Sequence, residues 1–74
     1  MTKDDLYFYV CAKKELEFKF NGVTYCLNYD KTPEGKEVII FGPIYEGKKY
    51  SSYGELVNNA KVENHFFREM LEDL

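Results

Sequence analysis

LEFKFNGVTYCLNY, residues 16–29, is the stretch that decides the fold. Its centre, Asn21-Gly22, separates two runs in which apolar and polar residues alternate. Because both residues tolerate the positive φ that a two-residue type I′ turn requires, the pattern predicts a β-hairpin. The turn fixes the register and places three opposed apolar pairs on one face: Phe20 with Val23, Phe18 with Tyr25, and Leu16 with Leu27. The other face is mostly polar, which is typical of an antiparallel sheet packed on one side only.

A third strand is predicted at residues 37–42, where β-branched residues are concentrated, after a polar loop at 30–36 and before a connection at 44–49. This strand is apolar on both faces. One alternative is that Ile39 and Phe41 face away from the helices. Their apolar surface would then favour contact with a partner or a homodimer.

Residues 3–14 carry conflicting signals for a helix and for a strand. Thr2 resembles an N-cap, Asp4-Asp5 would lie in the first turn and Lys13-Lys14 near the last, as a helix prefers. The aromatic and β-branched residues at 6–11 favour a strand instead. Since the two end signals agree with each other, we predict a helix over residues 3–14.

The C-terminal part is predicted to be helical from Ser52 onward. Ser52 and Glu55 have the spacing of a capping box, and apolar residues follow at helical spacing. The apolar stripe is interrupted at Glu63-Asn64, so residues 52–74 form either one helix or two joined near 61–64. Two are favoured, because Asn64 could cap the second.

These elements predict the α+β fold class. We expect one domain over residues 1–74, in which an N-terminal helix, a three-stranded antiparallel meander and one or two C-terminal helices pack on one sheet face. With 74 residues, 45% of them hydrophobic, the chain is too short for a second core and apolar enough to fold.

The composition also predicts where the protein works. The longest apolar run, residues 6–12, is far shorter than the about 20 residues that cross a bilayer. Residues 1–5 are acidic where a secretory signal would be basic. Two cysteines are too few for a disulfide framework, which predicts free thiols and a cytoplasmic location, the host cytoplasm if the chain is phage-encoded.

The charge of the chain is concentrated near its C-terminal end. Ten basic and thirteen acidic residues give a net charge of −3, which disfavours a role in coating nucleic acid. Five acidic residues and two basic ones lie after residue 54, so 5 − 2 = 3 negative charges account for the whole excess. The acids are Glu55, Glu63, Glu69, Glu72 and Asp73. They are either an acidic face for a basic partner or an ordinary solvated surface.

No motif of catalysis or cofactor binding is found in the sequence. Phosphate-binding glycine loops, HExxH, CxxC, GxSxG and EF-hand patterns are missing. Cys11, Cys26 and His65 lack the spacing of metal ligands, and His65 is the one histidine that could serve a thiol as a base. We therefore expect a protein that is not an enzyme and has no metal or cofactor.

Tyrosine is the unusual residue of this chain. Seven of the 74 residues are tyrosine, and three of them lie between residues 44 and 53 with two lysines. Tyrosine offers a large contact area at low entropic cost and is enriched where proteins bind partners, although the rings could also roof a small core. The candidate residues are Tyr45, Lys48, Lys49, Tyr50 and Tyr53. Stacking on single-stranded nucleic acid is not favoured, because Glu46 and Glu55 lie beside the lysines.

Two functions follow from these patterns. The first is a small noncatalytic protein-binding or accessory module that acts through the tyrosine-rich surface. The second rests on architecture, since a helix, a three-stranded sheet and C-terminal helices in a small acidic chain resemble some phage-encoded anti-CRISPR inhibitors and other DNA-mimicking proteins. That resemblance implies that the five acids, with Tyr45, Tyr50 and Tyr53, would block the nucleic-acid channel of a target protein.

Overall fold

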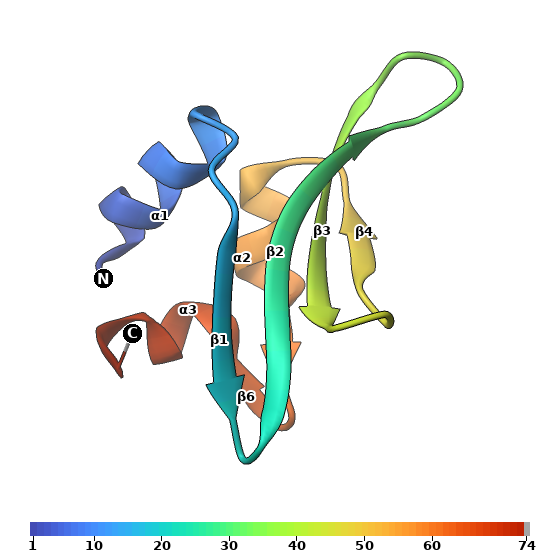
Figure 1. Ribbon diagram of the computed structural model, residues 1–74. Coiled ribbons are helices and arrows are strands. Elements are labelled where there is room, and N and C mark those ends of the chain that lie inside the picture. Colours follow the sequence, from blue (N-terminus) through green and yellow to red (C-terminus); the bar gives the residue numbers. More distant parts are fainter. Residues whose placement is uncertain (74) are drawn as a thin grey trace.

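The computed structural model describes residues 1–73 and has an α+β architecture (Figure 1). A single helix precedes a four-stranded sheet, and short helices and a small hairpin follow it. The elements are α1 (Lys3–Cys11), β1 (Leu16–Phe20), β2 (Val23–Lys31), β3 (Glu37–Pro43), β4 (Lys48–Tyr50), α2 (Tyr53–Asn59), β5 (Lys61–Val62), β6 (His65–Phe66), α3 (Phe67–Met70) and the 3₁₀ turn η1 (Leu71–Asp73).

The β1–β2 hairpin has the predicted turn and register. Asn21 and Gly22 have φ values of 51° and 79°, as a type I′ turn requires. All three predicted pairs are opposed, including Phe18 with Tyr25, whose rings stack at 5.6 Å between centroids. The prediction for residues 16–29 is confirmed.

The sheet is an antiparallel meander in the order β1-β2-β3-β4, so the prediction of three strands is wrong by one. Lys48 and Lys49, expected at the end of a connection, form β4 together with Tyr50 and pair with β3, with Tyr50 opposite Ile39. The turn before β4 is tight, because the Glu46 N–H donates to the Pro43 carbonyl at 2.8 Å. This turn returns the chain alongside β3 without a longer loop.

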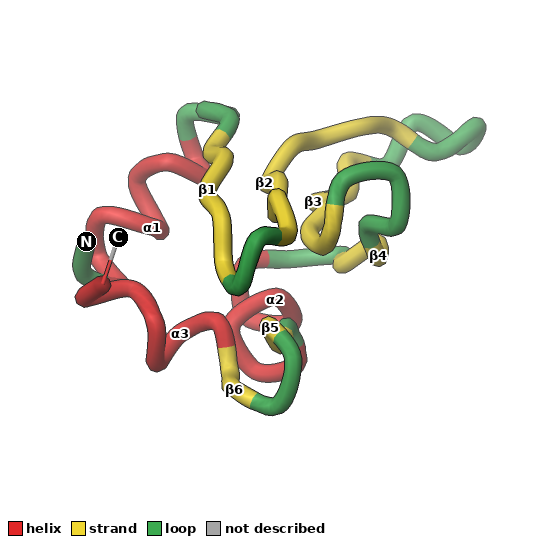
Figure 2. Tube along the Cα trace, turned by 60° about the horizontal axis from the view of Figure 1, so that its bottom comes forward, coloured by secondary structure: helices red, strands yellow, loops and turns green. Residues whose placement is uncertain are grey.

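One face of the sheet carries the core and the other carries no helix. In Figure 1, α2 lies behind the sheet and α3 extends from behind β1 to its left, and Figure 2 shows both helices on the same side of the strands. Ile39 and Phe41 are 6% and 2% exposed and belong to the core, so the alternative in which they face away from the helices is wrong. Val38 and Ile40 lie on the outer face instead and are half-buried.

The helix α1 begins as predicted and ends earlier. The Thr2 hydroxyl accepts from the Asp5 N–H at 3.1 Å, and the Asp5 carboxylate accepts from the Thr2 N–H at 3.0 Å, which completes a capping box. The helix ends at Cys11 because Lys13 takes a left-handed conformation with φ 54°. The N–H groups of Lys13 and Lys14 then donate to carbonyls of the last turn at 3.1 and 2.8 Å, a Schellman arrangement.

The C-terminal segment contains two short helices separated by a small hairpin. The Ser52 hydroxyl caps α2 by accepting from the Glu55 N–H at 3.1 Å. The predicted helix start at the Ser52 cap and the favoured division into two helices are confirmed, although the Glu55 carboxylate accepts from Ser51 and does not complete a capping box. The linking residues form β5 and β6 rather than a helical joint, and Asn64 lies in their turn. The prediction that Asn64 caps the second helix is wrong, since α3 follows Phe66 and has no side-chain cap.

The buried residues form one cluster between the inner sheet face and the helices. Its centre is aromatic, with Phe41 and Phe67 stacked at 4.2 Å and Phe18 stacked on Phe67 at 5.9 Å. Leu6 of α1 and Leu56 of α2 are fully buried in the same cluster. Among residues 1–73, no helix combines the length and apolar character needed to cross a membrane.

Candidate protein-binding site

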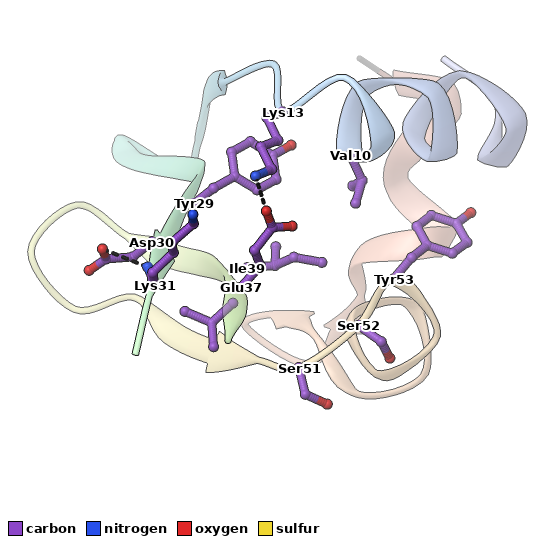
Figure 3. A pocket seen from close by; sticks show the side chains of 11 residues that line it. Val10, Lys13, Tyr29, Asp30, Lys31, Glu37, Ile39, Ser51, Ser52 and Tyr53 are labelled. Carbon is purple, nitrogen blue, oxygen red and sulfur yellow. Dashed lines mark hydrogen bonds and ion pairs between the residues drawn. The ribbon is translucent and has the colours of Figure 1, made fainter. Parts of the chain in front are cut away.

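A groove of about 480 Å³ opens where three distant parts of the chain meet (Figure 3). The end of α1, the adjoining ends of β2 and β3, and the loop between β4 and α2 form its walls. We call it the α1–sheet groove. It is lined by Val10, Lys13, Tyr29, Asp30, Lys31, Glu37, Val38, Ile39, Ser51, Ser52 and Tyr53.

Two tyrosines form walls of the groove and hold α1 in place. The Tyr29 hydroxyl donates to the Lys14 carbonyl at 2.8 Å, and the Tyr53 hydroxyl donates to the Lys3 carbonyl at 3.0 Å. Since the hydroxyls are used in these bonds, the rings present mainly carbon to the groove. Burial raises the pKa of both tyrosines, with nearby carboxylates adding to the effect, so both hydroxyls stay neutral at physiological pH.

The floor of the groove is apolar and its rim is charged but balanced. Ile39 is buried below the opening, and Val10 is half-buried beside it. On the rim, Lys13 forms an ion pair with Glu37, and its hydrogen bond and charge hold the pKa of that carboxyl below its usual range. Together with Asp30 and Lys31, the rim carries two positive and two negative charges. Such a site favours an apolar group without a large net charge.

The hydroxyl groups of the groove already have partners. Ser52 caps α2, and the Ser51 hydroxyl donates to the Glu55 carboxylate at 2.5 Å. Within the described chain, the groove lining includes no imidazole or thiol that could activate either serine. Residues 1–73 also contain no group of three His, Cys, Asp or Glu residues that could hold a metal ion.

The tyrosine-rich segment is divided between three environments. Tyr53 lines the α1–sheet groove, and Tyr50 is buried at 8% exposure, because its pairing with Ile39 points it into the core. Tyr50 therefore does not contribute to an exposed tyrosine surface. Tyr45 is 96% exposed in the turn after β3, and Lys48 and Lys49 are exposed on β4. A continuous surface of all five residues is not formed.

The five C-terminal acids are all exposed and are spread over several elements. Glu55 lies in the first turn of α2 and accepts from Ser51. Glu63 lies in the β5–β6 turn and accepts from the Asn21 side chain at 3.1 Å. Glu69 belongs to α3, while Glu72 and Asp73 belong to η1. Two of the five therefore already form hydrogen bonds within the protein.

Most of the groove was missed in the sequence. Tyr53 was identified, whereas Val10, Lys13 and Tyr29 were not. Ile39 was considered for contact with a partner, but on the opposite sheet face. Tyr29 is the last residue of the alternating pattern at 16–29, which places its ring on the apolar sheet face. This placement is only a weak signal for a binding residue. The others are brought together only by the packing of α1 against the sheet, which no local pattern encodes. Comparison of the chain with models of protein families, with curated proteins and with solved structures finds no match.

Proposed function

We propose that this protein is a small noncatalytic protein-binding module whose α1–sheet groove receives an apolar side chain from an extended segment of a partner protein. The observation that carries the proposal is the groove itself, with its buried Ile39 floor and its two walls of hydrogen-bonded tyrosine. Because these rings are already fixed, a ligand would not have to order them on binding.

The size and charge of the groove support a peptide ligand. A volume of about 480 Å³ accommodates one or two large side chains, and the balanced rim offers both a lysine and a carboxylate to the backbone of a bound segment. An apolar anchor in a desolvated pocket, surrounded by polar rim contacts, is the usual energetic pattern of such interfaces.

The test uses a displayed library of random peptides selected against the protein. Ser51→Trp would fill the groove from an exposed loop, and Glu34→Trp adds the same ring to the exposed turn between β2 and β3. Selected peptides are expected to share one apolar anchor and to shift the amide resonances of Val10, Ile39 and Tyr53. Ser51→Trp should weaken their binding about tenfold or more, and Glu34→Trp should leave it within twofold. The proposal would be contradicted if the selected peptides bound Ser51→Trp as tightly as Glu34→Trp. It would also be contradicted if the folded wild type selected no peptide from the library.

The acidic-inhibitor hypothesis rests on fewer free carboxylates than the sequence indicated. Glu55 and Glu63 have intramolecular partners, so Glu69, Glu72 and Asp73 remain as the candidates for contact with a basic channel. Reversing these three charges to lysine separates the two functions. A peptide bound in the groove should be retained, whereas a complex driven by carboxylates should be lost and should already weaken steeply with salt.

A further inference from the structure

The outer face of the sheet holds a second groove, of about 430 Å³, on the side that carries no helix. It lies between β2, β3 and the turn that precedes β4, and it is lined by Cys26, Asn28, Ile40, Gly42, Pro43, Ile44, Tyr45 and Gly47. Ile44 is 45% exposed and Tyr45 is 96% exposed. Large apolar side chains exposed beside a groove are typical of a binding surface.

The turn that carries Tyr45 is built at a conformational cost. Tyr45 has φ 72° in a position where a turn normally uses glycine. Two residues later, a Cβ on Gly47 would lie 2.6 Å from the Cγ2 of Ile40, so a larger residue would force the Ile40 side chain or the turn to move. The fold thus holds a bulky aromatic ring in water in a backbone conformation that such residues rarely adopt.

Charge is arranged across this face from one edge of the sheet to the other. The registers place Asn28 beside Ile40 and Ile40 beside Lys49 on the outer face. Glu15 comes directly before Leu16, which pairs with Leu27, so the antiparallel register places Glu15 opposite Asn28. Both residues line a small hollow. One row across the sheet, which we call the outer row, therefore reads Glu15, Asn28, Ile40 and Lys49. It begins with a negative charge, is neutral in the middle and ends with a positive charge.

The outer row is complementary to itself under a two-fold rotation. A rotation axis parallel to the strands and between β2 and β3 brings β1 of one copy over β4 of another. Glu15 then faces Lys49 of the second copy, and Lys49 faces Glu15 of the second copy, with the two Ile40 side chains near the axis. Facing sheets pack about 10 Å apart, a distance that a glutamate and a lysine span together.

We propose that the outer sheet face is a homodimer interface, in which two copies pack around this two-fold axis with paired Glu15 and Lys49 and with Ile40, Ile44 and Tyr45 covered. The contact is isologous, so each ion pair occurs twice. The proposal is independent of the α1–sheet groove, since the groove does not include the outer row. A dimer of this kind would carry two such grooves.

The test is a charge swap read by sedimentation equilibrium. The wild type is expected to dimerise, and Glu15→Lys and Lys49→Glu should each weaken dimerisation about tenfold or more, because each places two like-charged pairs in the interface. The double variant should recover the wild-type affinity. An equimolar mixture of the two single variants should form a heterodimer, since every pair between them is then of opposite charge.

Two controls distinguish the interface from effects of net charge. Glu34→Lys and Lys36→Glu make the same changes in the loop between β2 and β3 and should leave the dimer constant unchanged. Tyr45→Asn, which suits the positive φ, should weaken the dimer without unfolding the chain. The proposal is overturned by a wild type that stays monomeric up to about 1 mM, or by a dimer that tolerates both single reversals. Neither result bears on peptide binding in the α1–sheet groove.

Discussion

Tyr45 combines a backbone conformation that is costly for tyrosine with a ring that lies almost entirely in solvent. A left-handed conformation costs a non-glycine residue about 1–2 kcal/mol, and its ring gains nothing back, being 96% exposed in a single copy of the chain. Selection for the fold alone would favour glycine or asparagine at this position. A tyrosine at this position is consistent with the proposed contact with a second copy, which the isolated chain does not make.

Replacement of Tyr45 by glycine is expected to stabilise the monomer. Removal of the strain, reduced by the greater flexibility of glycine in the unfolded chain, should raise the free energy of unfolding by about 0.5–1 kcal/mol. Urea denaturation at a concentration too low for self-association measures the change. The matched control is Glu46→Gly in the same turn, where φ is not positive and stability should fall. A destabilised Tyr45→Gly monomer would show that the ring contributes to the fold.

At the level of elements, the ion pair between Lys13 and Glu37 ties the end of α1 to the start of β3 across the groove. The hydrogen bond from Lys13, its charge and the charge of Lys31 lower the pKa of Glu37 from its ordinary value of 4.5. A carboxyl with a lowered pKa in the folded state stabilises the fold above its unfolded pKa, and this contribution is lost as the pH falls through the folded value.

The stability difference between wild type and Glu37→Gln should therefore be constant near neutral pH and should shrink as the pH falls below 4.5. Denaturation at a series of pH values measures it, and added salt should reduce the difference because both side chains are exposed. Glu34→Gln serves as the control for loss of a nearby carboxylate. A difference that grows on acidification would contradict the assigned pair.

The elements that could be predicted from the sequence are those with local chemical signals. Asn21-Gly22 set the hairpin and its register, and the caps at Thr2 and Ser52 marked two helix starts. The strand β4 lacked such a signal, because Lys48-Lys49 resemble a loop and pair only after β3 is in place. The groove combines residues from 10–13, 29–39 and 51–53, so packing rather than local pattern determines it.

For the whole molecule, stability depends on a small aromatic core. Phe67 is fully buried and stacks on both Phe41 and Phe18, which joins the C-terminal helices to the sheet. Its truncation to alanine should cost about 3–5 kcal/mol. Since domains are stable by only about 5–15 kcal/mol, and the smallest lie near the lower end, Phe67→Ala is expected to be largely unfolded at 37 °C.

Thermal unfolding followed by circular dichroism tests this expectation. Phe66→Ala is the neighbouring control, because Phe66 is only half-buried and packs against Lys61 and Arg68 at the surface. Phe66→Ala should lower the melting temperature much less than Phe67→Ala does. Equal decreases in melting temperature for the two variants would mean that the stack of Phe18, Phe67 and Phe41 is not the main source of stability.

The way α1 is attached has a consequence for motion. This helix buries one side chain completely, Leu6. It is also held by the half-buried Val10, by the edge contact of Tyr7 with Tyr53, by two tyrosine hydroxyls and by one exposed ion pair just after its end. Its release would leave the hairpin and the aromatic stack intact, so it requires less free energy than global unfolding. The amides of α1 would then exchange with solvent sooner than those of the central strands, and the same excursion would widen the entrance to Ile39 for an arriving ligand.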